Sequence, residues 1–371
     1  MTKVKFNSRN RIRREDAFQL TGDLFAIDGD TLDIMRSTPV HRPTESRKAA
    51  IDLENDIHPS ISDFVVNVKR RQEEARVAES MEMDTSCLSD PDTFTFISFG
   101  SGSSGNCAYL GYNGAGILID AGVDPDTVKE GLRSHGISPR SLLGIIVTHD
   151  HSDHVKFAYS LLHKRFDMGL YCTPKTLTGL LRRHSISRRI KDYHRPIYKE
   201  FPFKVGPFEI TAFDVSHDGT DNVGYFITHG DHTMAIATDL GGITPRVDHY
   251  MRLANHIVIE SNYDEQMLAN GPYPMHLRAR IAAPNGHLDN KVTAAFLAEI
   301  ASEHLRDIFL CHLSNDNNTP QLALNTVRQA LECAGVGPIG NGDGSIESSE
   351  LPLQLSALPR KEPSSLFALR K

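Results

Sequence analysis

A histidine-rich segment directly behind an apolar run most strongly limits what this chain can fold into. The run from Leu142 to Val147 is short, continuous and rich in branched aliphatic residues, which predicts a buried strand. It leads at once into Thr148–His154, which carries three histidines and the carboxylate of Asp153. Imidazole suits zinc, iron or manganese, and a carboxylate favours a hard divalent ion. The segment can therefore surround two metal ions at once; a histidine-rich polar loop, or a single adventitious metal site, is the alternative.

Three further ligand candidates follow apolar stretches later in the chain. His217 comes after residues 208–213, Asp239 after residues 233–238, and His312 after residues 308–311. A strand end is the point from which a rigid sheet can direct a side chain at a fixed position. Each of these residues alone would indicate only a turn. In this order, together with the first segment, they predict one shared metal centre.

In these residues the chain resembles the metallo-β-lactamase-fold hydrolases, whose signature is His-x-His-x-Asp-His followed by a histidine, an acidic residue and a final histidine. The resemblance covers about residues 94–335 and is nearest to the YycJ/VicX/WalJ-like branch. That branch is indicated by Ser101–Asn106, Thr238–Gly241, Glu260–Asn262, Gly286–Asn290 and His312–Asn318. The resemblance implies an α/β fold of the metallo-β-lactamase-like αββα type, with two mixed β-sheets packed face to face and helices outside. Composition alone would support only a mixed α/β fold.

The resemblance also implies two divalent metal ions, Zn²⁺ or Mn²⁺. By analogy, the first ion would be held by His149, His151 and His217, the second by Asp153, His154 and His312, with Asp239 bridging both. Two divalent ions lower the pKa of a water molecule held between them, so a bridging hydroxide is the expected nucleophile. Asp153 and Asp239 are therefore also candidate catalytic residues.

The residues expected to contact the substrate lie outside this ligand set. His287 stands before a predicted helix and could bind phosphate or protonate the leaving oxygen. A helix-capping or core histidine is the alternative. A Gly/Ser loop and the segment behind the last ligand could also bind phosphate. These further candidates are Ser104, Asn106, Ser314 and Asn318.

A basic segment near the first metal motif indicates the class of substrate. Residues 155–199 hold eleven Lys and Arg against two Asp, a local excess of 11 − 2 = 9 positive charges, although the whole chain carries −7. Such an excess suits an extended polyanion better than a small thioester. The candidate phosphate contacts are Arg182, Arg183, Arg188 and Arg189. A solvated helix face is the alternative.

Members of the resembled branch are bacterial phosphodiesterases that act on DNA, with exonuclease activity the leading assignment. The chain is therefore expected to be a dinuclear-metal-dependent nuclease with DNA as its partner, and most simply an exonuclease. A glyoxalase-II-like thioesterase or lactonase on the same scaffold is one alternative. A non-catalytic metal-binding regulatory protein is another, although the complete ligand set argues against it. The oligomeric state is left open.

Composition divides the chain into three parts. Residues 1–92 are polar and interrupted by prolines, which predicts a partly disordered extension. Residues 93–335 form the expected hydrolase domain, and residues 336–371, rich in Gly, Pro and Ser, are expected to be a flexible tail. The five cysteines lack Cys-x-x-Cys spacing, no apolar run reaches eighteen residues, and the basic N-terminus has no apolar segment. These features predict a cytoplasmic protein with reduced thiols that does not enter a membrane.

Local patterns predict alternating strands and helices within the expected domain. Strands are expected at 93–98, 107–111, 116–120, 142–147, 168–172 and 307–311, with three β-rich segments between 202 and 238. Helices are expected at 125–135, 154–164, 174–184, 289–303 and 320–333.

Overall fold

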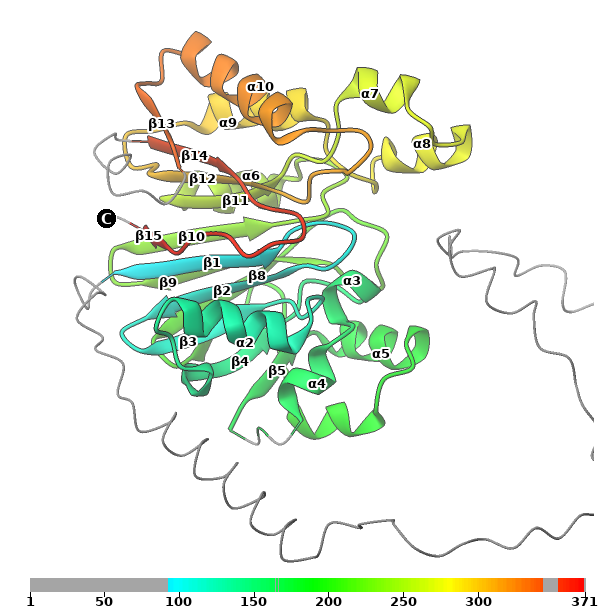
Figure 1. The fold of residues 1–371 in the computed structure, drawn as a ribbon, viewed down its shortest axis with the longest axis vertical. Coiled ribbons are helices and arrows are strands. Elements are labelled where there is room, and N and C mark those ends of the chain that lie inside the picture. The colour runs from blue at the N-terminus through cyan, green and yellow to red at the C-terminus, as the bar shows by residue number, and fades with distance from the viewer. Residues whose placement is uncertain (1–92, 164, 166, 343–352, 370–371) are drawn as a thin grey trace, which may run out of the picture. The chain divides into compact units, whose positions relative to one another are not determined.

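The computed structural model describes residues 93–163, 165, 167–342 and 353–369; the predicted extension at residues 1–92 lies outside them. Two mixed β-sheets pack face to face, and helices cover the outer face of each sheet (Figure 1). The predicted αββα sandwich is confirmed.

The first sheet has seven strands in the order β15-β1-β2-β3-β4-β5-β6. Its strands are β1 (Phe94–Gly100), β2 (Cys107–Tyr112), β3 (Ala115–Ile119), β4 (Leu142–Ile146), β5 (Gly169–Cys172), β6 (His194–Pro196) and β15 (Phe367–Leu369). Strands β1, β2 and β3 are antiparallel, whereas β3 to β6 run parallel. Parallel neighbours bring successive strand ends to one edge of the sheet, and the edge after β4 holds the histidine-rich segment.

The second sheet has eight strands in the order β13-β14-β12-β11-β10-β9-β8-β7. Its strands are β7 (Phe203–Val205), β8 (Phe208–Asp214), β9 (Val223–His229), β10 (His232–Ala237), β11 (His256–Glu260), β12 (Asp307–Cys311), β13 (Ile339–Asn341) and β14 (Leu353–Ala357). Strands β10, β11, β12 and β14 are parallel neighbours. Their carboxyl ends therefore share an edge, as those of β3 to β6 do in the first sheet.

The helices form the two outer layers. The first sheet is covered by α2 (Pro125–Ser134), α4 (Ala158–Leu162) and α5 (Pro174–Arg183), and the second by α6 (Pro245–Leu253), α9 (Asn290–Ile300) and α10 (Pro320–Cys333) (Figure 1). Shorter elements are η3 (Pro139–Ser141), α3 (Ser152–Val155), η4 (Arg188–Tyr193), α7 (Glu265–Asn270) and α8 (Met275–Ile281). Helices α2, α5, α6 and α10 each begin with a capping Asp or Thr followed by proline. The cap satisfies a free backbone N–H and proline presets the first helical turn, so each of these starts has a local signal in the sequence, although no helix had been predicted at α6.

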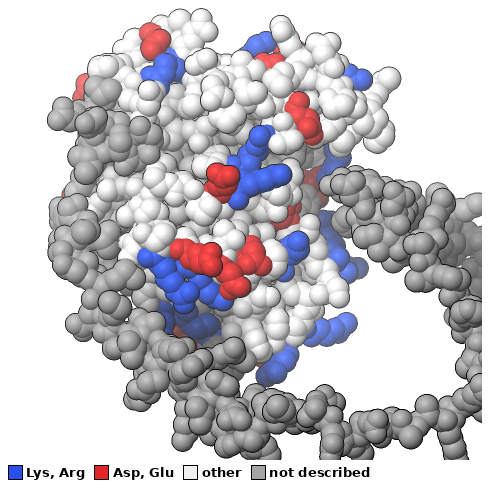
Figure 2. Space-filling view, viewed as in Figure 1, with Lys and Arg blue, Asp and Glu red and all other residues white. Residues whose placement is uncertain are grey.

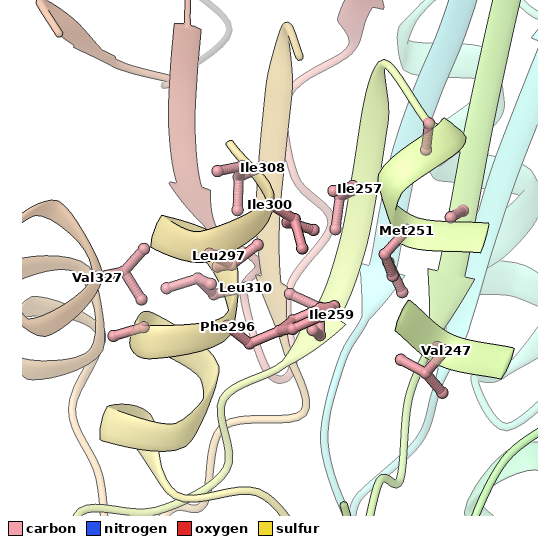
Figure 3. Packing of buried hydrophobic residues seen from close by; sticks show 14 of the residues in the cluster. Val247, Met251, Ile257, Ile259, Phe296, Leu297, Ile300, Ile308, Leu310 and Val327 are labelled. Carbon is pink, nitrogen blue, oxygen red and sulfur yellow. The ribbon is translucent and has the colours of Figure 1, made fainter. Parts of the chain in front are cut away.

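Apolar side chains form three layers of core, one between the sheets and one under each helical layer. Between the sheets, the ring of Phe96 on β1 packs against that of Phe309 on β12, with 5.0 Å between centroids. Under the second helical layer, side chains of α9 such as Phe296 and Leu297 face Ile259 on β11 (Figure 3). Burial of these apolar side chains fixes the position of one sheet relative to the other. The site at their shared edge depends on that position.

One predicted helix is interrupted. Instead of a continuous helix over 154–164, the chain forms α3 and α4 with a break at Phe157. The backbone N–H of Phe157 donates to the carbonyl of Ala121 at 2.9 Å, so it does not continue the first helix. The periodic pattern is local and cannot register this competing tertiary bond, which is why the prediction was wrong here.

The expected flexible tail is also wrong for the described part of residues 336–371. Strand β14 lies between β13 and β12 in the second sheet, and β15 pairs with β1 in the first. The side chains of Leu355 and Leu369 are each 1% exposed. The many Gly, Pro and Ser residues made the composition of this segment resemble that of a disordered tail. Alternate apolar residues such as Leu353 and Leu355 are nevertheless buried and anchor it in the sheet.

No helix within the described residues is long and apolar enough to cross a membrane.

Candidate metal centre

The predicted ligands come together at the edge where the two sheets meet. The histidine-rich segment follows β4 of the first sheet, whereas His217, Asp239 and His312 follow β8, β10 and β12 of the second. Because strand ends from both sheets contribute, the site exists only when the sheets are packed together.

Potential ligand atoms form overlapping groups in which all atoms lie within 4.8 Å of one another. Two groups coincide with the sets expected for the two ions: His149, His151 and His217; and Asp153, His154 and His312. Asp239 forms a group with His149 and His154, its Oδ2 lying 3.2 Å from His154 Nε2. Its Oδ1 lies 3.7 Å from His217 Nε2 and 3.5 Å from His312 Nδ1. Asp239 thus stands between the two sets.

The donor set fits divalent metal ions. His149 Nε2 and His312 Nε2 are buried atoms without a hydrogen-bond partner among the described residues. Leaving a buried polar atom unsatisfied costs about 1–3 kcal/mol, so a native structure normally provides a partner. Metal coordination would satisfy both atoms, and imidazole with carboxylate is a donor combination that Zn²⁺ and Mn²⁺ accept.

Burial and local charge shift the pKa values of the predicted ligands in different directions. Burial by itself lowers the pKa of His154 and of His312, but neighbouring carboxylates, Asp239 among them, outweigh it and raise both. Burial, aided by the neighbouring histidines, lowers the pKa of His149 well below its usual value, so its ring is neutral. Burial by itself raises the pKa of Asp239, but His312 and His154 outweigh it and lower that pKa well below the usual range. A neutral imidazole and an ionised carboxylate are the forms that coordinate metals.

The backbone is strained at this edge. Asp120, Asp239 and His312 adopt left-handed φ angles of 61°, 54° and 53°. Such angles cost about 1–2 kcal/mol per non-glycine residue and collect at functional sites when packing holds them in place. The backbone here is arranged to direct side chains rather than to minimise local energy.

Asp120 orients one ligand and was not singled out from sequence. Its Oδ2 accepts hydrogen bonds from His154 Nδ1 at 2.7 Å and Thr148 Oγ1 at 2.8 Å. This bond leaves His154 Nε2 facing the other ligands, the arrangement that metal-binding histidines usually have. An acidic residue directly after strand β3 was the available signal.

Glu260, at the end of β11, is fully buried beside the ligands. Its Oε1 accepts from His287 Nδ1 at 2.7 Å and from His312 Nδ1 at 2.9 Å. Its Oε2 accepts from the backbone N–H groups of Leu240 and Leu288. This glutamate was expected only as part of the resemblance, and its place after the apolar stretch of β11 was the available signal of its role.

Asp218 was likewise not predicted as a site residue, although it directly follows His217. Its Oδ1 is buried without a hydrogen bond and lies 3.3 Å from His151 Nε2 and 3.5 Å from His217 Nε2. Its Oδ2 accepts from Arg280 at 2.7 Å. One oxygen thus points at the predicted first metal position while the other is anchored.

The Gly/Ser loop Ser101–Asn106 contributes mainly contacts that orient the predicted ligands. Asn106 is buried, and its Nδ2 donates to Asp153 Oδ2 at 3.1 Å, so the structure favours a ligand-orienting role over substrate contact. A Cβ at Gly122 would lie 1.5 Å from the Asp153 carbonyl oxygen, so this close approach requires glycine. Ser104 is exposed, and its neighbour Ser103 lines the adjoining hollow.

A hollow of about 190 Å³ adjoins the centre. Its lining includes His217, Asp218, Arg280, His287 and Ser314. Two of the predicted substrate contacts, His287 and Ser314, are therefore placed where a substrate could reach them. Asn318 is not: it is 2% exposed and donates to the carbonyls of Ser261 and Asn262, a structural role.

The four predicted arginines do not line this hollow. Arg183 lies 3.5 Å from Asp150, and Arg189 lies 3.9 Å from Asp192. Arg182 and Arg188 line a separate hollow beside α5. The four arginines therefore fall into two that contact aspartates, Arg183 and Arg189, and two that line the separate hollow, Arg182 and Arg188.

Similarities to known proteins agree with this geometry. The sequence profile of the "Beta-lactamase superfamily domain" matches residues 116–310. The chain is 33% identical over 243 residues to "Exodeoxyribonuclease YycJ" of Bacillus anthracis, an alignment that covers 64% of this chain and 89% of the relative. It is 30% identical over 245 residues to "Exodeoxyribonuclease WalJ" of Streptococcus pneumoniae, covering 66% and 90%.

Solved structures share the fold at low sequence identity. The metallo-β-lactamase fold protein YhfI of Bacillus subtilis has a TM-score of 0.54 at 13% identity, covering 75% of this chain and all of that one. Zn²⁺-bound PqqB of Methylobacterium extorquens has a TM-score of 0.51 at 16% identity, covering 74% and 100%. Together with the profile match and the curated relatives, these findings confirm the resemblance: the chain belongs to the beta-lactamase superfamily, a family of metal-dependent hydrolases.

Proposed function

We propose that this protein is a dinuclear-metal-dependent exodeoxyribonuclease. The observation that carries the proposal is the overlap of the ligand groups: seven predicted ligands form two sets with Asp239 between them, more than one tetrahedral ion can use. The relatives that are about one-third identical are named exodeoxyribonucleases. The basic surface beside α5 also favours a polyanionic substrate over a small acyl compound.

Under this proposal the ions would be held by the predicted ligands, Zn²⁺ and Mn²⁺ both suiting the donor set. When bound, they would supply Lewis-acid activation of water and of a phosphoryl oxygen. The chain's own residues determine where the substrate lies and how protons move.

His287 is proposed as the proton donor to the leaving oxygen. Its Nδ1 is occupied by Glu260, so Nε2 is the nitrogen left for the substrate, and the side chain lines the hollow. Burial by itself lowers the pKa of His287, but the Glu260 carboxylate outweighs it and raises that pKa. A protonated imidazole at the hollow can give its proton to a departing oxygen.

Arg280 and Ser314 are proposed to position the phosphodiester. Both line the hollow, and the side chain of Arg280 is about half exposed while it holds Asp218. A guanidinium has five donors, so Arg280 can bind a phosphate oxygen while it keeps its bond to the carboxylate.

The test is incubation of the purified full-length protein with end-labelled single- and double-stranded DNA in the presence of Mn²⁺, Zn²⁺ or a chelator. The expected result is metal-dependent shortening from an end, with about two ions per chain by elemental analysis. Cleavage of circular DNA, which has no ends, would show that the protein is an endonuclease and not an exonuclease. Intact DNA beside a cleaved thioester would overturn the nuclease proposal, and intact forms of both would favour a non-catalytic role.

A further inference from the structure

Some Lys and Arg side chains of the basic segment, residues 155–199, form ion pairs in the folded structure, and others do not. Arg165 bonds Asp167, Lys199 contacts Asp214 and Asp221, and Arg183 and Arg189 have aspartate partners. By contrast, Arg182, Arg188 and Lys191 form no ion pair with any described carboxylate, and all three are exposed. In the space-filling view, Lys and Arg predominate at the lower right of the described domain, where α5 lies (Figures 1 and 2).

The three unpaired cations line one hollow of about 460 Å³. Its remaining lining consists of apolar and neutral polar residues: Pro174, Leu177, Thr178, Leu181 and His194. His194 donates from Nε2 to the carbonyl of Cys172 at 3.0 Å, which fixes its ring. The volume falls within the range of about 300–1,000 Å³ that small-ligand sites occupy.

A nucleotide unit fits this lining better than a bare anion. Three cations without an acidic neighbour in the lining match phosphate, and the leucine and proline surface with the fixed imidazole matches the face of a base. Inorganic phosphate would use only the charges. A small acyl compound could use the apolar surface but carries no phosphate for the three cations.

The position of the hollow relative to the metal centre follows from helix α5. Pro174, Leu177, Thr178, Leu181 and Arg182 repeat at helical spacing and form the face towards the hollow. The opposite face contacts Asp150, the residue between the ligands His149 and His151: a Cβ at Gly179 would lie 2.0 Å from Asp150 Oδ2. The hollow and the metal loop are thus separated by one helix, whose diameter is about 10 Å.

We infer that this hollow is a second nucleotide-binding subsite, which holds the DNA strand away from the bond that is cleaved, across helix α5 from the metal loop. The inference rests on the proposed nuclease function and specifies how that site takes a strand rather than a single nucleotide. Arg182, Arg188 and Lys191 bind backbone phosphates, and Leu177, Leu181 and His194 form the surface for a base.

The test uses the metal-loaded, full-length protein and a triple variant, Arg182→Ala, Arg188→Ala and Lys191→Ala. The control, Lys129→Ala, Arg133→Ala and Lys204→Ala, removes the same three charges from other surfaces. KM and kcat are measured for end-labelled single strands of about twelve nucleotides at several salt concentrations. The rate with bis-p-nitrophenyl phosphate is measured in parallel.

The triple variant should raise KM for the strand on the order of tenfold with little change in kcat. The log–log dependence of 1/KM on salt should flatten by about 2, since each lost single-strand contact removes about 0.7. The small phosphodiester and the control variant should behave as wild type does.

Three outcomes would overturn the inference. A triple variant with the same KM for the twelve-nucleotide strand as the control would show that the three cations do not contact the strand. Equal loss on the small phosphodiester would mean that they support the fold. A mononucleotide such as dTMP that inhibits wild type only through these residues, and as tightly as the strand binds, would make the hollow a free-nucleotide site. If wild type itself leaves every DNA substrate intact, the proposed function fails first, and that result differs from all three.

Discussion

Of three acidic residues outside the predicted ligand set, Asp120 and Glu260 orient metal-site histidines, and Asp218 points one oxygen at the first predicted metal position. Asp120 bonds His154, Glu260 bonds His287 and His312, and Asp218 lies against His151 and His217. A histidine can present only one ring nitrogen to a metal, so the partner of the other nitrogen fixes its orientation. At the scale of single residues, these contacts decide the geometry of the centre.

Asp239→Ala should abolish turnover while the fold persists. The carboxylate stands between the two ligand sets, and its removal leaves neighbouring histidines without their common counter-charge. We expect activity to fall at least about 100-fold, with bound metal reduced. Elemental analysis, circular dichroism and the nuclease assay check this. Near-normal activity in the variant would show that Asp239 does not bridge.

Asp218→Asn should weaken metal binding about 10- to 100-fold. The change keeps the size of the side chain but removes the charge on the oxygen that points at the first ligand set. Chelator competition and the visible spectrum of the Co²⁺-substituted protein measure the effect without relying on activity. Asp248→Asn, on the surface of α6 and paired with Arg252, is the matched control. Identical affinities for both variants would exclude Asp218 from the site.

At the scale of elements, parallel strand ends and the C-terminal segment position the loops of the centre. The N–H of Ser101 donates to the carbonyl of Arg360, whose side chain donates in turn to the carbonyl of Ser314. The segment that follows β14 thus connects a loop of the first sheet with a loop of the second. Through these two hydrogen bonds the segment helps to hold both loops in place beside the metal centre.

Deleting residues 353–371 should prevent stable folding. The deletion removes strand β14 from between two neighbours, together with the buried side chains of Leu353, Leu355, Leu358 and Leu369. At about 1.5–3 kcal/mol each, these four leucines contribute at most roughly 6–12 kcal/mol, comparable to the whole stability of a domain.

A milder variant keeps this prediction testable if the deletion is insoluble. Leu355→Ala should lower the free energy of unfolding by about 2–5 kcal/mol, whereas Lys361→Ala, on the exposed part of the same segment, should change it by less than about 0.5 kcal/mol. Denaturant titration measures both. A soluble, cooperative and active deletion protein would show that the tail is dispensable after all.

At the scale of the whole molecule, the two sheets share one metal centre, so metal binding and sheet packing should be coupled. Ligands that bind only the folded state add stability in proportion to the logarithm of their concentration over Kd. At about 100 times Kd the gain is about 2.7 kcal/mol, or roughly 5–11 °C in Tm for a domain of this size. Chelation should lower Tm by that amount in wild type and by less in Asp239→Ala. An unchanged Tm would argue against coupling between the sheets and the ions.

Removing residues 1–90 should leave a folded, metal-binding and active protein. The described domain begins with β1 at Phe94, and its sheets and ligands all lie after that residue. Size-exclusion chromatography, metal analysis and the nuclease assay check the truncated chain. An insoluble or inactive product would show that the extension packs on the domain.

Sequence by itself determined many of the strands and the starts of α2, α5 and α10, because each depends on neighbouring residues. The strand 307–311 and the helix 320–333 have the predicted limits, since apolar periodicity and an N-cap followed by proline are local signals. The resemblance, carried by the His-x-His-x-Asp-His motif and by later strand ends, named the seven ligand candidates, all of which the structure places at one edge.

Only the tertiary structure decided which other residues join them. Glu260 and His312 are 52 positions apart, and the N–H of His312 donates to Ser101 Oγ across 211 positions. The structure likewise decided that Arg183 is paired while Arg182 is not, and that the apparent tail forms strands of both sheets. Such contacts follow from how the two sheets pack and not from any local pattern, because packing brings together residues whose own neighbours carry no sign of the partner.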